Sequence, residues 1–224
     1  KTMRLLITAL ACLLTVSLTA QELSIGDYYE GGIVFYLDGN GGGLVAASSD
    51  QSQNATWGCY GTLISGADGT AIGTGLQNTN EIENQCSTNG IAADICANLN
   101  LNGYTDWFLP SKDGLDSMYV NLHLQGLGDF ENDYYWTSTE WAQFDSWYVN
   151  FSDGTVDYIH PPINKSDQIR VRAIRAVVLV PTPGCTNPTA SNFDPEATED
   201  DGSCIYTGCM ASNACNFNEN ATED

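Results

Sequence analysis

Cysteine is the residue type whose number and spacing carry the most chemistry in this 224-residue sequence. Clustered cysteines either bind zinc or form disulfides. No two cysteines have the C-x₂-C spacing of a zinc site, and the sequence holds only two histidines. We therefore predict disulfides, which require an oxidising compartment. The candidates are Cys59, Cys86, Cys96, Cys185, Cys204, Cys209 and Cys215.

A group of carboxylates near the C-terminus has the ligand chemistry of a calcium site, because Ca²⁺ prefers hard oxygen ligands. The group consists of Asp194, Glu196, Glu199, Asp200 and Asp201. A tight turn is expected at Gly202, but the spacing is not that of an EF-hand loop. The alternative is a solvated acidic spacer without a metal.

Catalytic motifs are missing from the sequence. It contains neither the nucleophilic serine motif G-x-S-x-G nor the zinc-protease motif H-E-x-x-H. The glycine-rich stretch 39–43 lacks the Lys-Ser/Thr of a phosphate-binding loop. Among 28 acidic residues, carboxylate pairs of the glycosidase type arise by chance and identify no site. We therefore predict that the protein is not an enzyme.

The C-terminal region contains an internal repeat. GCTNPTASNFDPEATED, from Gly184, aligns with GCMASNACNFNENATED, from Gly208, at a period of 24 residues. Each copy is too short and too polar to bury a core, so it needs a disulfide, a metal or both. The second copy stops before an equivalent of the Asp-Gly-Ser-Cys at 201–204. We expect the natural chain to continue and to supply the missing cysteine partner.

Residues 1–20 have the pattern of a secretory signal peptide. Lys1 and Arg4 precede an apolar stretch from residue 5 to 18, and the small residue Ala20 follows. That stretch is shorter than the roughly 20 residues of a membrane-spanning helix. A membrane anchor and lipidation at Cys12 are the alternatives. We predict cleavage after Ala20 and a secreted or cell-surface protein without a membrane span.

The charge of the chain excludes several classes of partner. The formal net charge is −21, from 28 acidic and 7 basic residues. Such a charge repels nucleic acids, sulfated polyanions and anionic membranes. A hydrophobic content of 42% and an aromatic content of 10% still suffice for a folded core.

The elements that position these residues fall into a main domain, residues 21–180, and an acidic tail, residues 181–224. The patterns predict a hairpin of residues 33–37 and 44–47, helices over 92–98 and after the N-cap Ser111, and strands at 134–139, 146–151, 156–159 and 169–178. Residues 51–90 are predicted as a long irregular loop that Cys59 and Cys86 are placed to close. Two helices and many short strands indicate an α+β fold.

Large and charged side chains in strand-like contexts are predicted to be structural. Trp107, Trp136 and Trp147 are expected in the core. Arg172 and Arg175 are expected to pair with carboxylates, because cations are scarce in this chain. Glu140 and Asp106 are their candidate partners.

Five blocks of sequence, taken in order, resemble one known family. They are GGIVFY at 31–36, DWFLPSKD at 106–113, YWTSTE at 135–140, WYVNF at 147–151 and VRAIR at 171–175. Over residues 25–178 the chain resembles the C-terminal domain of the Legionella collagen-like protein, a family close to the Fibrobacter succinogenes major paralogous domain. The resemblance implies a C-type-lectin-like α+β fold and an extracellular binding or adhesion role. The tail resembles acidic Cys/Asn-rich repeats of exported Bacteroidetes proteins.

The resemblance also implies candidate ligand-binding residues, because C-type lectins usually bind sugar through a calcium ion held beside an aromatic side chain. These candidates are Glu140, Trp141, Tyr148, Asn150 and Asp153. The Glu-Pro-Asn sugar motif is missing, and a simple turn at 152–154 is the alternative. An aromatic platform is a further hypothesis, with Tyr134, Tyr135, Trp141, Phe144 and Tyr148 as its candidates.

The sequence therefore predicts an exported binding or adhesion module for a glycan or protein ligand. A neutral glycan, a protein or a calcium-bridged ligand fits the acidic charge better than a sulfated glycan does. The alternative is a structural or display component of an extracellular stalk with calcium-stabilised repeats. A lesser alternative is a catalyst similar to formylglycine-generating enzymes, but the late cysteine pair that this resemblance implies is absent from residues 97–184.

Overall fold

The computed structural model describes residues 23–158, 163–178, 183–195, 197, 199–208 and 221. The predicted signal peptide and the cysteines at 209 and 215 lie outside these residues. The chain divides into two compact units. One unit is Leu23–Val180, called the main domain below, and the tail from Pro181 belongs to the other.

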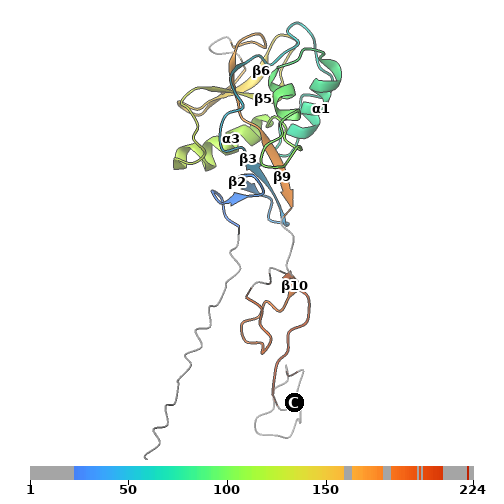
Figure 1. The fold of residues 1–224 in the computed structure, drawn as a ribbon, viewed down its shortest axis with the longest axis vertical. Coiled ribbons are helices and arrows are strands. Elements are labelled where there is room, and N and C mark those ends of the chain that lie inside the picture. Colours follow the sequence, from blue (N-terminus) through green and yellow to red (C-terminus); the bar gives the residue numbers. More distant parts are fainter. Residues whose placement is uncertain are drawn as a thin grey trace, which may run out of the picture. The chain divides into compact units, whose positions relative to one another are not determined.

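The main domain contains two sheets in its described residues. The first has the order β1-β2-β3-β9, with β1 at Tyr28–Tyr29, β2 at Gly32–Leu37, β3 at Gly42–Ala46 and β9 at Ile174–Val178. The second has the order β4-β8-β5-β6-β7, with β4 at Ser52–Ala55, β8 at Ile169–Val171, β5 at Tyr134–Glu140, β6 at Ser146–Asn150 and β7 at Thr155–Asp157. Figure 1 shows β2, β3 and β9 at one end of the domain and β5 and β6 nearer the other.

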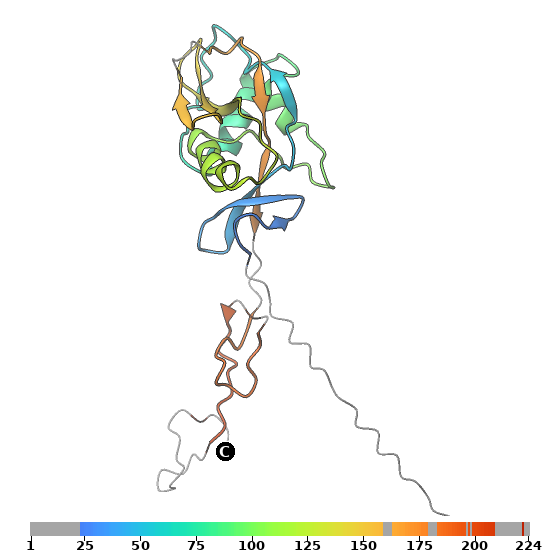
Figure 2. The ribbon, with the colours of Figure 1, turned by 90° about the vertical axis from the view of Figure 1, so that its left-hand side faces the viewer.

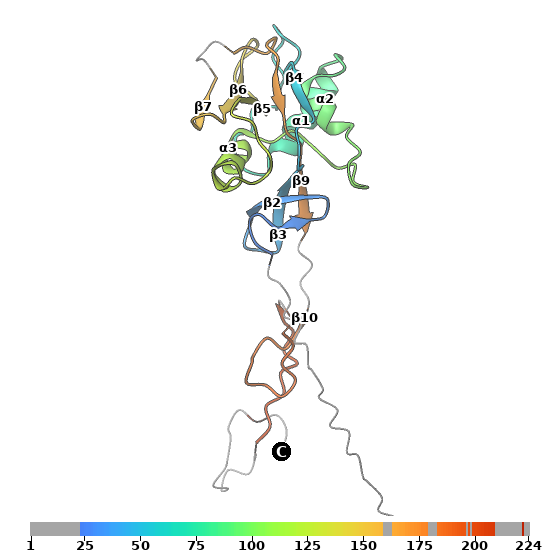
Figure 3. The same ribbon diagram turned by 60° about the vertical axis from the view of Figure 1, so that its left-hand side comes forward.

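The helices pack against the second sheet, and the third also packs against β2 of the first sheet. They are α1 at Gly75–Gln85, α2 at Ala92–Ala97 and α3 at Lys112–Asn121, followed by the 3₁₀ turn η1 at His123–Gln125. Figure 3 shows α1 and α2 beside β4, and α3 below β6 and β7. The described residues thus form a mixed α+β domain, as predicted. No helix among them is long and apolar enough to span a membrane.

The pairing of β2 with β3 confirms the predicted hairpin of residues 33–37 and 44–47, with its turn at 38–41. The Asp38 carboxylate accepts hydrogen bonds from the backbone N–H groups of Asn40 (2.7 Å) and Gly42 (2.8 Å). These bonds favour the ionised form and lower the pKa of Asp38. Strand β9 then pairs antiparallel with β3, so that the first and last strands of the domain share one sheet (Figure 2).

Helix α1 lies inside the stretch predicted to be irregular, and that prediction was wrong for residues 75–85. The helix has few apolar residues, and Ile82 is its only large apolar side chain that is buried. It is stabilised instead by hydrogen bonds between its polar side chains and other segments of the chain. The buried Asn78 side chain accepts from the Gly69 N–H (3.1 Å) and donates to the Gly69 carbonyl (2.7 Å), and the Thr79 hydroxyl accepts from the Leu109 N–H (3.1 Å). These contacts outweigh the weak local helix signal.

A disulfide joins Cys59 to Cys86, directly after α1, with the Cα atoms 5.8 Å apart. This bond closes the long segment as predicted. Cys96 was also a disulfide candidate, and the structure corrects that prediction. It is a free thiol on α2, fully buried in the core cluster that also includes Ile91 and Ala92.

The predicted strand 169–178 is divided between the two sheets, because β8 ends at Val171 and β9 begins at Ile174. At the break, the Ala173 N–H donates to the Gln51 side chain and its carbonyl accepts from the Ala47 N–H (2.9 Å). Arg172 is fully buried at the same place. The segment therefore links the sheets.

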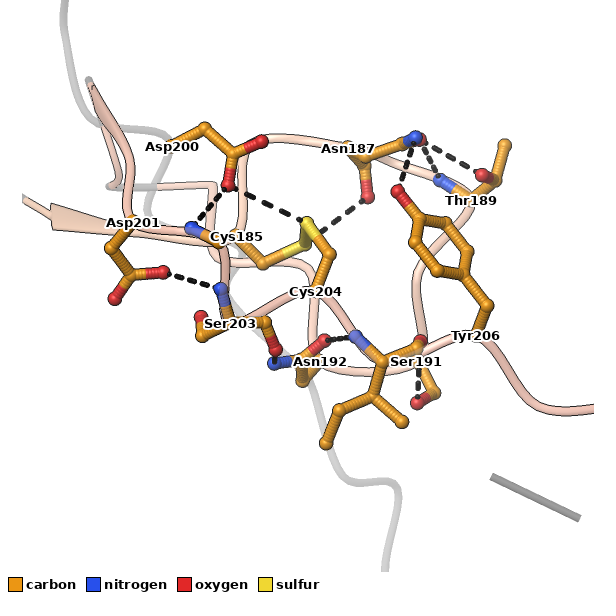
Figure 4. Close-up of a disulfide and its surroundings, with 12 residues drawn as sticks. Cys185, Asn187, Thr189, Ser191, Asn192, Asp200, Asp201, Ser203, Cys204 and Tyr206 are labelled. Atoms are coloured by element: carbon orange, nitrogen blue, oxygen red, sulfur yellow. Dashed lines mark hydrogen bonds between the residues drawn. A yellow bond between two sulfur atoms is a disulfide. The ribbon is translucent and has the colours of Figure 1, made fainter. Parts of the chain in front are cut away.

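The described part of the tail is organised around the disulfide Cys185–Cys204, with a Cα–Cα distance of 4.7 Å (Figure 4). Two short strands, β10 at Pro183–Gly184 and β11 at Glu199–Asp200, pair in parallel. The Asn192 side chain donates a hydrogen bond to the Ser203 carbonyl (2.7 Å) and accepts one from the Ile205 N–H (2.6 Å). The first repeat copy is thus closed by a disulfide and polar bonds, as its small apolar content requires.

Candidate binding surface

Three exposed aromatic side chains lie on two loops of the main domain that contact each other. Tyr60 is 55% exposed, Trp141 52% and Phe144 40%. The Tyr60 and Phe144 rings pack with centroids 5.0 Å apart. The Gly61 N–H donates to the Gln143 carbonyl (2.9 Å), which joins the loop after Cys59 to the turn between β5 and β6.

Trp141 does not project alone. Its ring stacks on Tyr158 at a centroid distance of 4.0 Å and an interplanar angle of 28°. Trp147 meets both rings edge-on, at 5.7 Å from Trp141 and 4.5 Å from Tyr158. We call Tyr60, Trp141, Phe144, Trp147 and Tyr158 the aromatic surface. Trp147 was predicted to be core, but it is only partly buried and supports this surface instead.

The turn that carries Trp141 and Phe144 is fixed by main-chain hydrogen bonds. The N–H groups of Trp141 (3.1 Å) and Ala142 (3.0 Å) donate to the Asp145 carbonyl. The Lys165 N–H donates to the Phe144 carbonyl (3.0 Å). The rings are therefore presented by an ordered turn, which lowers the entropy that a ligand must remove on binding.

A buried ion pair between Glu140 and Lys165 lies beneath this turn, with both side chains at most 3% exposed. The Glu140 carboxylate also accepts from the Ile64 N–H with both oxygens (2.9 and 3.0 Å). Lys165 donates to the Thr62 carbonyl (3.0 Å), and its ammonium lies 4.4 Å from the Trp57 ring centroid. Burial lowers the pKa of Lys165, and the hydrogen bond and charge of Glu140 oppose that shift.

These contacts correct the prediction for Glu140. Its oxygens are committed to the chain, and the side chain fastens the loop at 62–64 to the end of β5. The prediction that Glu140 pairs with an arginine is also wrong, because its partner is Lys165.

The other predicted ligand residues have different positions. Tyr148 is fully buried and packs edge-on against Tyr134 at 5.6 Å, so it cannot contact a ligand at the surface. Asn150 accepts from the Ser152 N–H (2.9 Å) and Asp153 from the Thr155 N–H (2.9 Å). The latter bond lowers the pKa of Asp153. Both therefore close the turn between β6 and β7, which was the alternative interpretation.

Among the candidate residues of the aromatic platform, Trp141 and Phe144 are exposed, whereas Tyr135 and Tyr148 are fully buried. Sequence reasoning missed Tyr60 and Tyr158. Tyr60 directly follows a disulfide cysteine, and an aromatic residue on a closed loop is the signal that could have identified it. No local pattern identifies Tyr158, which reaches the surface only through the pairing of β7 with β6.

The predicted calcium ligands are not brought together. Over the described ranges, no group of three or more His, Cys, Asp or Glu side chains is arranged to hold a metal ion. Asp200 accepts from the Gly202 N–H (3.0 Å) and Asp201 from the Ser203 N–H (2.9 Å). The side chain of Ser203, and after it this N–H, lowers the pKa of Asp201. Glu196 lies outside the described residues. Calcium binding stays a prediction.

Every lysine and arginine in the described part of the chain forms an ion pair. The pairs are Lys112–Asp113 (3.0 Å), Lys165–Glu140, Arg170–Asp50 (2.9 Å), Arg170–Asp133 (3.0 Å), Arg172–Asp50 (2.7 Å), Arg175–Asp106 (2.8 Å) and Arg175–Glu30 (3.2 Å). The predicted pairing of Arg172 and Arg175 with carboxylates is confirmed, and Asp106, one of the two candidate partners, pairs with Arg175. Lys112 also lies 5.0 Å from the centroid of Trp147.

A small pocket of about 210 Å³ lies elsewhere on the main domain, between α1 and the segment before α3. Its lining includes Leu76, Thr79 and Trp107. Asp106 contributes to the wall, but its carboxylate is bound to Arg175, and this hydrogen bond lowers the pKa of Asp106. The one acidic residue of the lining is therefore already engaged in an ion pair.

Comparisons with known proteins give one extended match and several short ones. The model of the Lcl C-terminal domain matches residues 47–175, which leaves the first resembling block, at 31–36, outside. A ribulose bisphosphate carboxylase/oxygenase activase of rice is 66% identical over 29 residues, 12% of this chain and 6% of that protein. The Larrea tridentata activase 1 is 56% identical over 36 residues, 16% of this chain and 8% of that protein. The chain thus spans less than a tenth of these relatives.

Proposed function

Because the chain belongs to the Lcl C-terminal domain family, we propose that it is an extracellular, non-enzymatic binding module whose ligand contacts the aromatic surface. The two disulfides within the described residues support an oxidising, extracellular location. The signal-peptide pattern of residues 1–20 supports the same location. We also propose a C-type-lectin-like fold, supported by a mixed domain whose first and last strands share a sheet.

The exposure of ordered aromatic rings is the observation that carries this proposal. Trp141 keeps about half of its surface in water although a neighbouring ring and a bonded turn fix its position. Aromatic side chains supply large contact areas at low entropic cost, and they dominate the energetics of many binding sites. Exposed rings on an otherwise well-packed domain therefore favour a ligand contact.

The proposal that the module is not an enzyme is supported by the residues available for chemistry. The sequence lacks the serine and zinc-protease motifs, and residues 97–184 contain no cysteine. The one free cysteine in the described residues, Cys96, is buried, and burial raises the pKa of its thiol. A buried, protonated thiol is a poor nucleophile.

Arrays of extracellular glycans and proteins, probed with residues 21–224, test the proposal. We expect binding that the Trp141→Ala variant loses and the Leu124→Ala variant keeps. Leu124 is the matched control, because it is 57% exposed and lies in η1, outside the aromatic surface. Circular dichroism must show that both variants are folded. Equal binding by the wild type and Trp141→Ala would contradict the proposal.

A structural role for the tail is the second candidate function. The described part of the first repeat copy closes on its own disulfide and on polar bonds such as Asn187 to the Tyr206 hydroxyl (2.8 Å). A unit of this kind can be repeated along a chain without a shared core, which suits an extracellular spacer. Full-length chains with further copies, and no ligand for the main domain, would favour this candidate.

A further inference from the structure

We propose, building on the binding function above, that the aromatic surface recognises an uncharged carbohydrate by stacking a sugar ring on Trp141, without a metal ion. Figures 1 and 3 show the strands β5 and β6 whose connecting turn carries this tryptophan. Charge, ring geometry and hydrogen-bonding capacity each support the assignment.

Charge argues against an anionic ligand. A sulfate or carboxylate group is usually bound by Lys or Arg side chains with free donors. Each of the five cations in the described ranges already pairs with an acid. Lys112, the cation beside Trp147, is bound to Asp113. With a net charge of −21, the chain repels polyanions and leaves no free cation in the described residues to compensate.

The geometry of the rings favours a flat ligand. Tyr158 covers one side of Trp141, and the 52% exposure of the tryptophan leaves an open area for contact. The face of an aromatic ring is electron-rich, so it attracts C–H groups that carry partial positive charge. One side of a sugar ring presents such C–H groups in a nearly flat array. A protein partner instead requires about 800 Å² per side with anchors buried in pockets.

A neutral hydrogen-bonding side chain belongs to the same turn as the exposed rings. Gln143 is exposed and stands between Trp141 and Phe144 in the turn. An amide both donates and accepts hydrogen bonds, as a hydroxyl does, so it suits sugar hydroxyl groups without a charge. Tyr60, packed on Phe144, adds a second exposed ring. Two ring groups on joined loops fit a chain of sugars rather than a single one.

Affinity electrophoresis of residues 21–224 in gels containing soluble polysaccharides tests the inference. The neutral probes are laminarin, galactomannan and xyloglucan, and the anionic probes are heparin and dextran sulfate. We expect retardation by at least one neutral probe, no retardation by the anionic probes, and no effect of EDTA. Trp141→Ala should weaken the binding at least about tenfold, Gln143→Ala should weaken it less, and Leu124→Ala should leave it unchanged.

The outcomes separate this inference from the proposed function. Retardation by anionic probes alone, loss of binding in EDTA, or neutral-probe binding insensitive to Trp141→Ala would overturn it. If no polysaccharide binds but a purified extracellular protein binds in a Trp141-dependent manner, the binding function stands and the carbohydrate assignment falls. If neither class of ligand binds the folded chain, both fall.

Discussion

The burial of Cys96 on α2 determines the reactivity of its thiol. The side chain is fully buried within the larger core cluster, which also includes Trp107 and Trp136. Burial, followed by the negative charge of Glu83, raises the pKa of Cys96. The thiolate, the reactive form, is therefore scarce in the folded protein.

We expect Cys96 to resist alkylation in the native protein and to react fully after unfolding. Iodoacetamide treatment at pH 8, followed by peptide mass mapping, measures the modified fraction at this position. Cys59 and Cys86 serve as internal references, because a disulfide leaves both unmodified until it is reduced. Rapid modification of Cys96 without denaturant, or its recovery in a disulfide-linked peptide, would contradict the structure.

The pair of Asp106 and Arg175 predicts a pH dependence of stability. Hydrogen bonds from Arg175 lower the pKa of Asp106 below its usual value of 3.8. A carboxyl whose pKa is lower in the folded state adds stability above its unfolded pKa. This stability is lost as the pH falls through the folded value. The contribution is therefore complete at pH 7 and declines below about pH 4.

Asp106→Asn should lower the free energy of unfolding by about 0.5–1 kcal/mol at pH 7, as expected for a partly exposed ion pair. The difference from the wild type should shrink at pH 3, because the wild-type carboxyl becomes protonated. Urea denaturation at the two pH values measures both quantities. Asp68→Asn is the control, since this acid is exposed and forms no ion pair in the described residues. A difference that is constant with pH would refute the linkage.

At the scale of elements, the disulfide Cys59–Cys86 fastens the loop of Tyr60 to the end of α1. The bond closes a segment with a sequence separation of 27. For a loop of this length, the loss of chain entropy in the unfolded state gives a stabilisation of about 2–4 kcal/mol. The same bond limits the motion of one loop of the aromatic surface.

The double variant Cys59→Ala/Cys86→Ala should therefore lose about 2–4 kcal/mol of stability in urea unfolding. Hydrogen exchange should become faster in residues 59–67. The matched control is Cys185→Ala/Cys204→Ala, which removes the other disulfide from the tail unit. Unchanged stability and exchange in the first variant would show that noncovalent contacts, such as those of Glu140 and Lys165, hold the loop without the disulfide.

Elements with a strong local pattern could be predicted from the sequence, and those held by tertiary contacts could not. The turn at 38–41 and the N-cap Ser111, which accepts from the Gly114 N–H (3.3 Å), both follow from local chemistry. Helix α1 depends on the bonds of Asn78 to Ser138 and of Thr79 to Leu109. The break after Val171 depends on the placement of Gln51 and Ala47. These partners are far apart in the sequence, so no local window contains them.

The candidate site follows the same division. Both Glu140 and Trp141 were candidates from the sequence. Glu140 is the last residue of β5 and is buried against Lys165, whereas Trp141 lies in the turn that follows and is exposed. Which aromatic residues are exposed depends on how β5, β6 and β7 pack. The pattern of apolar residues does not contain this information.

For the whole molecule, the acidic charge is distributed unevenly. The described cations all lie in the main domain and pair there with acids. The tail from Pro181 has acidic residues and no lysine or arginine. Its negative charges are therefore balanced by solvent ions or by a bound cation such as calcium.

Hydrogen exchange of residues 185–204 in the full chain distinguishes neutralisation of the tail by solvent ions from neutralisation by a bound calcium ion. In the described tail, the disulfide Cys185–Cys204 closes the loop, and Asp200 and Asp201 accept backbone hydrogen bonds. We therefore expect reduction to remove most of the protection and EDTA to have a smaller effect. The Asp201→Asn variant, which keeps a side-chain acceptor but removes the charge, is the control. If EDTA removes as much protection as reduction does, and added Ca²⁺ restores it, calcium is a main stabiliser of the repeat. If EDTA has no effect, the acidic residues act as a solvated spacer.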